Sequence, residues 1–240
     1  MRIISNDIIL FLFVAAVSAC GGKKQADTAK VVSVKDYETG TFTVAAGDGS
    51  VEGLLGNVTQ DEIERVFSAH RDAMFRCYQE ALEDLEEIEG EVHFELQVAS
   101  DGTVDSAFIS DSDLGSIETE SCMLDQVRSF RFKRVPGGVA VLYYPMTLEA
   151  PYDPPEPAHW DNGKVRDTVE ANRDVIDGCL TGASGIVVTL YVGKGGMVLS
   201  SGAAGKTLEA YDDAVCLARA ARSWTFSAPA RDLAKVRLSF

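Results

Sequence analysis

The sequence predicts an α+β protein made of two tandem domains. In each domain the elements follow in the order α-β-β-α-β, so that a three-stranded antiparallel sheet packs against two helices. Two observations lead to this prediction. The first is an internal repeat, and the second is that both copies show the same succession of helical and strand-like hydrophobic patterns.

The repeat is clearest over residues 122–132 and 216–226. Both stretches have a cysteine, a following aliphatic residue, an Arg-Ser pair and two aromatic residues on alternate positions. The same offset continues back without a gap to Val98 and Val192. Further upstream Cys77 corresponds to Cys179 at a larger offset, so the copies differ in length between the first helix and the first strand.

In the first copy, Thr59-Gln60-Asp61-Glu62 has the form of a capping box and predicts the start of a helix. Apolar residues then recur at three- and four-residue steps as far as Leu85. Strict alternation follows on both sides of the turn at Asp101-Gly102. The expected elements are a helix from residue 59 to 85, strands 92–98 and 104–109, a helix 116–129 and a strand 139–148.

The second copy shows the same order, with a helix 165–180, strands 186–192 and 197–200, a helix 208–223 and a strand 234–240. The glycines around Lys194 lie at the position of a hairpin turn and lack the Walker spacing, so no nucleotide site is expected. His70 stands where the other copy has Asn172. This substitution favours a hydrogen-bonding structural position over a catalytic histidine.

The chain divides into five segments. These are a signal peptide at 1–19, a lipidated tether at 20–56 with a pattern compatible with a short hairpin, a first domain at 57–150, a proline-rich linker at 151–162 and a second, divergent domain at 163–240. The linker contains four prolines within residues 151–157 and should restrict the relative orientation of the domains.

The N-terminus has an apolar run at residues 8–16 that is followed by Val17-Ser18-Ala19-Cys20. This resembles a bacterial lipobox, in which the cysteine becomes the lipid-modified first residue of the mature chain. Cys20 is therefore the expected lipidation site, and Gly21 after it resembles an outer-membrane lipoprotein facing the periplasm. The alternative is an ordinary signal peptide with a coincidental cysteine.

Four further cysteines remain, two in each copy at matching places. Exported cysteines normally pair, and equivalent pairing within each copy is the simplest of three connectivities. We therefore predict the disulfides Cys77–Cys122 and Cys179–Cys216. A metal site is the alternative, but close Cys-x-x-Cys spacing is lacking and the histidines are not repeated, so neither a metal nor any other cofactor is expected.

The formal net charge of −15 argues against nucleic acid as a partner, and against docking on anionic lipids by charge alone. An acidic run at residues 83–91 occurs only in the first copy. It lacks the pattern of a calcium loop and is interpreted as a solvated helix end.

Several motifs of the first copy lie at the spacing of a known family. They are Cys77-Tyr78, Gly90-x-Val92-x-Phe94, Asp101-Gly102-x-Val104, Cys122, Phe130-x-Phe132, Gly137-Gly138 and Tyr144-Pro145. With them the chain resembles the C-terminal domain family of the gliding-motility proteins AgmX and PglI, which is similar to the TonB C-terminal domain. The match spans about 56–148 and is weaker over 163–240, where Leu180 replaces the tyrosine and Arg237 is aligned with Pro145.

The resemblance implies a periplasmic envelope module whose cysteines are structural, and it brings no catalytic residues. TonB-like domains bind partners by adding a strand to an open sheet edge. The implied edges are Tyr143 to Leu148, with Tyr143, Tyr144, Met146 and Leu148 as candidate binding residues, and Lys235 to Phe240.

The expected function is a non-enzymatic adaptor that recruits envelope proteins or peptides, in a motility or transport machine. A structural spacer without a specific partner is the second hypothesis. A cell-wall hydrolase is the third, and it would need a nucleophile–base or paired-carboxylate arrangement, neither of which appears in both copies or beside a recognisable turn motif.

Overall fold

The computed structural model describes residues 31–36, 40–45, 52–53, 56–150, 157–159 and 162–240. The predicted signal peptide, Cys20 and most of the predicted linker lie outside these residues. Within them, each repeat has the order α-β-β-α-β around three antiparallel strands, as the sequence predicts. We call residues 57–150 the first repeat and residues 163–240 the second repeat.

In the first repeat, a β-sheet packs against two helices. Its elements are α1 (Gln60–Asp84), β4 (Gly90–Val98), β5 (Val104–Ser112), α2 (Ile117–Arg128) and β6 (Ala140–Glu149). The strand order is β6-β4-β5, with β4 in the centre. Three N-terminal strands extend this sheet beyond β6, namely β1 (Val31–Asp36), β2 (Gly40–Ala45) and β3 (Glu52–Gly53).

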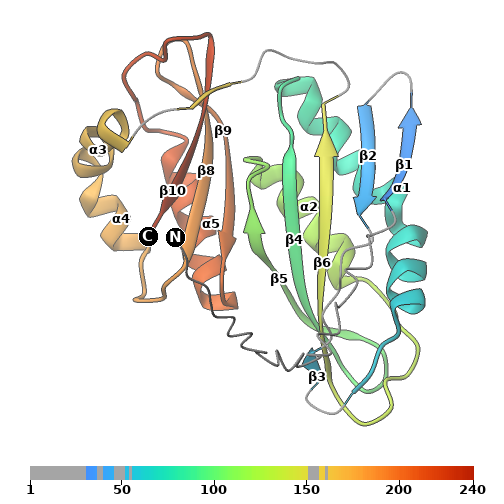
Figure 1. The fold of residues 1–240 in the computed structure, drawn as a ribbon. Coiled ribbons are helices and arrows are strands. Elements are labelled where there is room, and N and C mark those ends of the chain that lie inside the picture. Colours follow the sequence, from blue (N-terminus) through green and yellow to red (C-terminus); the bar gives the residue numbers. More distant parts are fainter. Residues whose placement is uncertain (1–30, 37–39, 46–51, 54–55, 151–156, 160–161) are drawn as a thin grey trace, which may run out of the picture.

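The second repeat follows the same path. The short strand β7 (Ala158–His159) precedes it, and its elements are α3 (Asn162–Ala171), α4 (Arg173–Cys179), β8 (Ile186–Gly193), β9 (Val198–Gly205), α5 (Leu208–Ala221) and β10 (Leu233–Ser239). The strand order is β7-β10-β8-β9, with β7 parallel to β10. The two sheets lie side by side, with β5 next to β9, and α2 and α5 lie on the same side of them (Figure 1).

The first helix of the second repeat differs from the prediction because it is interrupted at Asn172. This residue leaves the helical conformation, and its side-chain nitrogen donates to the Thr168 carbonyl at 2.8 Å. In the first repeat the His70 ring bonds the Val66 carbonyl at 2.9 Å. Both polar side chains therefore bind the carbonyl four residues earlier, which is the structural role expected for this position.

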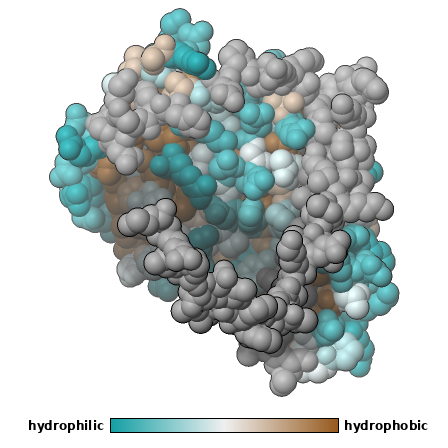
Figure 2. All heavy atoms as spheres, viewed as in Figure 1, coloured by the Kyte–Doolittle hydropathy of each residue, from teal (hydrophilic) through white to brown (hydrophobic). Residues whose placement is uncertain are grey.

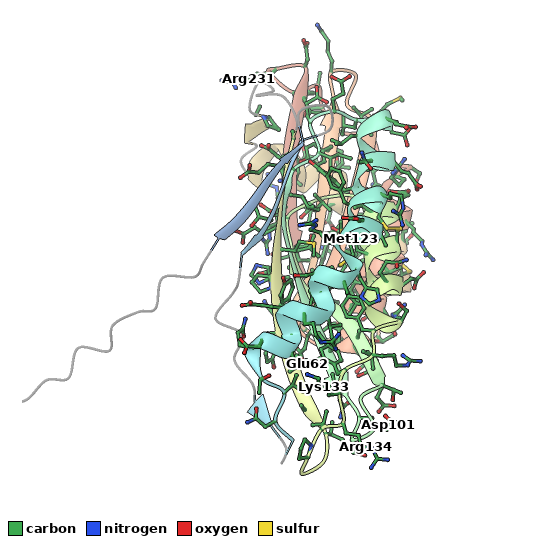
Figure 3. The ribbon with its side chains drawn as sticks, turned by 90° about the vertical axis from the view of Figure 1, so that its right-hand side faces the viewer. Glu62, Asp101, Met123, Lys133, Arg134 and Arg231 are labelled. Atoms are coloured by element: carbon green, nitrogen blue, oxygen red, sulfur yellow. A yellow bond between two sulfur atoms is a disulfide. The ribbon has the colours of Figure 1, made fainter. Side chains whose placement is uncertain are left out.

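Glu62 shows a second difference from the prediction. Thr59 caps α1 as expected, since its hydroxyl accepts from the Glu62 amide at 3.3 Å. The Glu62 carboxylate, however, binds Arg65 and the amide and Nζ of Lys133, which lies beside it in Figure 3. The hydrogen bond from Arg65 is the largest cause that lowers the pKa of Glu62 to about 2. The glutamate therefore ties the start of α1 to the loop after α2.

Candidate functional site

Both disulfides that were predicted are present. Cys77 at the C-terminal part of α1 is bonded to Cys122 in α2, and Cys179 at the end of α4 is bonded to Cys216 in α5. Each bond joins two helices of the same repeat. Cys20 lies outside the described residues, so its lipidation stays a prediction.

The edge strand of the first repeat, β6, is partly occupied by this chain itself. Thr147 to Glu149 pair with β2, and Ala140 and Val141 pair with β3. Of the four candidate binding residues, Tyr144, Met146 and Leu148 have their side chains in the core, with at most 2% of their surface exposed. Tyr143 is half-buried on the opposite face. A partner strand added at β6 could therefore bind only main-chain groups, over the short stretch between the residues that pair with β2 and those that pair with β3.

The edge strand of the second repeat, β10, leaves more of its main chain uncovered. Within the described residues it pairs with β7 only at Ala234 and Lys235. Phe240 and Ile186 exchange both of their main-chain hydrogen bonds, at 2.9 and 3.2 Å. Since such pairs alternate along an antiparallel ladder, the N–H and C=O groups of Arg237 and Ser239 point away from β8, toward the edge.

The strand register corrects the alignment that set Arg237 against Pro145. Pro145 is opposite His93 in β4, and Ser239 is opposite Val187 in β8. His93 and Val187 are equivalent in the repeat, so Ser239 is the counterpart of Pro145. The first repeat thus has a proline, which lacks a donor, where the second repeat has an amide with no main-chain partner among the described residues.

A groove of about 370 Å³ lies beside the β10 edge. Val165 and Val169 of α3 form one wall, and Leu238 and Phe240 form the other. Figure 2 shows hydrophobic side chains gathered in this region of the second repeat, next to hydrophilic ones. We call the main chain of Val236 to Phe240 together with this groove the β10 site.

The two repeats are not independent domains, because a buried interface joins them. Its centre is Glu120 of α2, which is fully buried. One carboxylate oxygen accepts from the Ala203 amide on the edge of β9 at 2.7 Å, and the other accepts from the Ser112 hydroxyl at 2.8 Å. Glu120 therefore accepts a hydrogen bond from a main-chain N–H group that would lack a partner at an unpaired strand edge. We call the contact between the repeats the inter-repeat interface.

Small residues of β9 let the first repeat approach this closely. At Gly202 a side chain would collide with the Glu120 carboxylate and would lie 2.7 Å from the Gly115 Cα. The Ser200 hydroxyl donates to the Gly115 carbonyl at 2.7 Å. The first repeat thereby reaches across β9 to the face of the second sheet that is opposite α5.

Strand β8 meets the first repeat on that face. The Tyr191 hydroxyl contacts the Glu89 amide and carbonyl at 3.2 Å, and the Thr189 hydroxyl donates to the Ser112 carbonyl at 3.3 Å. Lys235 of β10 donates to the Glu89 carbonyl at 2.8 Å. Both Tyr191 and Thr189 are at most 1% exposed. The repeats therefore share a polar, hydrogen-bonded and solvent-excluded contact.

Ion pairs surround this contact. Asp111 of β5 pairs with Arg237 and, at 3.6 Å, with Lys206. Burial works to raise the pKa of Asp111, but the two cations outweigh it and the pKa is lowered. Lys235 pairs with Asp113 at 3.7 Å. The charges of the two repeats are thus complementary where they meet.

The sequence contained a signal for this interface that periodicity alone did not reveal. The open face of β4 carries His93, Glu95 and Gln97, whereas the equivalent face of β8 carries Val187, Thr189 and Tyr191. A strand without a polar face is typical of a sheet covered on both sides. The second signal is Gly202, which stands where the first repeat has Phe108.

Glu120 predicts an unusual pH dependence. Burial raises its pKa from 4.5 to about 8, although the hydrogen bonds from Ala203 and Ser112 act to lower it. Between these values the folded protein holds a proton that the unfolded chain releases, so stability should fall as the pH rises from about 5 to 8, by up to about 1.4 kcal/mol per pH unit. Glu62 acts oppositely, because its pKa is lowered and its contribution is lost only in acid.

Urea unfolding at several pH values measures this slope. The control is Glu120→Gln, which keeps the shape of the side chain and removes the titration. We expect the slope between pH 5 and 8 to disappear in this variant. An equal slope in both proteins would show that Glu120 does not titrate in this range.

Comparison with protein-family models, with curated protein sequences and with solved structures found no match. The resemblance to the AgmX/PglI and TonB C-terminal families therefore stays a prediction. Among the described residues no helix is both long and apolar enough to cross a membrane.

Proposed function

We propose that this protein is a lipid-anchored, non-enzymatic adaptor of the bacterial cell envelope that recruits protein or peptide partners. The observation that carries the proposal is the pair of equivalent disulfides, one in each repeat. Such bonds persist in oxidising compartments outside the cytoplasm. Together with the lipobox-like sequence before Cys20, they support an outer-membrane lipoprotein that faces the periplasm.

The inter-repeat interface supports the proposal that the two repeats act together as a single binding platform. Hydrogen bonds from both repeats converge on buried groups, so contacts between the repeats hold their relative orientation. Among the described residues, the two carboxyl groups with the most strongly shifted pKa are Glu62 and Glu120, and both are bound by groups of this chain. Their roles are structural, which favours a binding protein over an enzyme.

The β10 site is the better of the two predicted edges for strand addition. Arg237 and Ser239 offer main-chain donors, and the groove beside them, which has both polar and apolar lining residues, can accept alternate side chains of a partner strand. The β6 edge, by contrast, is shortened by β2 and β3 and interrupted by Pro145. A motility or transport machine of the envelope is the setting in which we place this binding.

Ser239→Pro tests the proposal because it removes one outward donor. The first repeat has a proline at the equivalent position, so the fold accepts this residue there. Photo-crosslinking in the native envelope, followed by mass spectrometry, should identify partners whose yield falls roughly tenfold in this variant, since a lost ladder bond and a blocked edge act together.

Ser239→Ala is the matched control, because it keeps the amide and should keep the crosslinks. Metabolic labelling with a palmitate analogue tests the anchor in the same cells, and Cys20→Ser should lose the label. Undiminished crosslinks in Ser239→Pro would exclude the β10 site as the binding surface, and an unlabelled native protein would exclude the anchor.

A further inference from the structure

The strands β1 and β2 form a hairpin that occupies part of the edge of the first repeat. The two strands pair with each other at all six positions. Within the described residues, β2 pairs with β6 at three positions, from Thr41 opposite Glu149 to Thr43 opposite Thr147. Figure 1 shows the hairpin at the margin of the sheet, on the side away from the second repeat. We call β1 and β2 together the N-terminal hairpin.

The main chain of Thr147 faces this hairpin. In β4 the Glu91 amide donates to the Asp113 carboxylate at 2.6 Å, and the Glu91 carbonyl accepts from the Asp113 amide at 3.1 Å, both on the β5 side. Glu91 is opposite Thr147. Because bonded pairs alternate along an antiparallel ladder, the N–H and C=O groups of Thr147 face β2, whereas those of Met146 face β4. Opposite Thr43, β2 therefore binds Thr147 as an added partner strand would.

The second repeat shows that the fold does not require this hairpin. In both repeats a short strand before the first helix covers the start of the edge strand, since β3 pairs with Ala140 and β7 pairs with Ala234. These two alanines are opposite Val98 and Val192, which are equivalent in the repeat. Among the described residues, the second repeat has no counterpart of the N-terminal hairpin. The hairpin is therefore an addition to the first repeat.

Few main-chain bonds hold the hairpin to the first repeat. A two-stranded hairpin is at best marginally stable by itself, so its position depends on its pairing with β6. Alternation along the ladder makes Thr41 and Thr43 the residues of β2 whose main chain faces β6. By comparison, β4 and β6 pair at nine positions. The hairpin can therefore detach while the ladder between β4 and β6 stays intact.

We propose that the N-terminal hairpin is an internal strand ligand that closes the β6 edge at Thr147. When it detaches, an extended segment of a partner protein takes the place of β2 and forms the same main-chain bonds. The first repeat is thus a gated recruiting edge. The inference rests on the proposed recruitment of partner strands, but it concerns a different edge from the β10 site.

Hydrogen exchange in the native full chain in detergent measures this detachment. The Thr147 amide should exchange at least roughly tenfold faster than the Met146 amide, because detachment frees the first and leaves the second bonded to β4. Thr43→Pro removes the donor to the Thr147 carbonyl and should accelerate exchange at Thr147 roughly tenfold or more. Thr43→Ala keeps this donor and is the matched control. Equal exchange of the Thr147 and Met146 amides would overturn the proposal, because hairpin and sheet would then open together.

A labelled peptide with the sequence of residues 40–47 is the probe for the opened edge. A site that is open in about a tenth of the molecules binds its ligand about tenfold more weakly. Fluorescence anisotropy should therefore show roughly tenfold tighter binding to Thr43→Pro than to the native chain or to Thr43→Ala. The gain in affinity should match the acceleration of exchange at Thr147, because both report the same opening. Equal affinity of Thr43→Pro and the native chain would contradict the gate.

Two further measurements show where and how the peptide binds. In a chain that also carries Ser239→Pro, Thr43→Pro should increase binding of the peptide by the same factor. Loss of all peptide binding in Ser239→Pro would place the probe at the β10 site and overturn the gated edge, so the two failures are distinguishable. A peptide with proline in place of residue 43 should not bind, since it lacks the donor to β6. Equal binding of that peptide would exclude strand addition.

Discussion

Replacing Cys77 and Cys122 together with alanine should lower the free energy of unfolding by about 4 kcal/mol. The bond closes a sequence separation of 45 residues. On the chain-entropy model, its loss raises the conformational entropy of the unfolded chain and thereby lowers the free energy of unfolding by about this amount. This is a large share of the stability of a small domain. Urea unfolding of the oxidised proteins, followed by circular dichroism, measures the change.

The second disulfide provides the comparison for this prediction. Cys179 and Cys216 close a separation of 37 residues, so the same replacement there should cost a similar amount. Both variants remove one bond between two helices over a sheet. A stability unchanged by either double replacement would show that the bonds do not form, or do not matter, in the folded protein.

Replacing Gly202 with alanine should lower stability by about 2–3 kcal/mol, because a side chain there forces the repeats apart. The new Cβ would collide with the Glu120 carboxylate and approach the Gly115 Cα to 2.7 Å. The new Cβ would meet backbone on one side and a buried, hydrogen-bonded carboxylate on the other. No flexible group is therefore present that could move aside. Thermal unfolding should also become less cooperative, since the repeats would unfold separately.

Gly178→Ala is the matched control. Gly178 lies in α4, and a Cβ there would meet nothing within 4 Å. The same chemical change should be neutral or stabilise the protein by up to about 1 kcal/mol, since alanine favours helix. Similar losses in Gly178→Ala and Gly202→Ala would contradict a specific role of Gly202 at the inter-repeat interface.

The internal repeat made much of the fold predictable from sequence. The alternation in β4, the capping Thr59 and the matched cysteines are local signals, and all three appear in the structure as expected. Strand β9 was predicted only as far as residue 200, yet it continues to Gly205. Its last residues are small and carry little strand preference, so tertiary packing decides their conformation.

The inter-repeat interface could not be predicted in the same way. Glu120 lies in an amphipathic helix and would be expected at the surface, because glutamate is seldom fully buried. Only its partners on the other repeat, above all the Ala203 amide, explain its position. Likewise the counterpart of Pro145 became clear only from strand register, which places Ser239 there.

The docked arrangement of the two repeats is tested most directly by hydrogen exchange at the Ala203 amide. This amide lies on the outer edge of β9 and bonds the buried Glu120 carboxylate of the other repeat at 2.7 Å. If the repeats are docked, it should exchange as slowly as core amides of β8, and Gly202→Ala should accelerate it. Exchange of the Ala203 amide at the rate of an unprotected strand edge in the native protein would contradict the account.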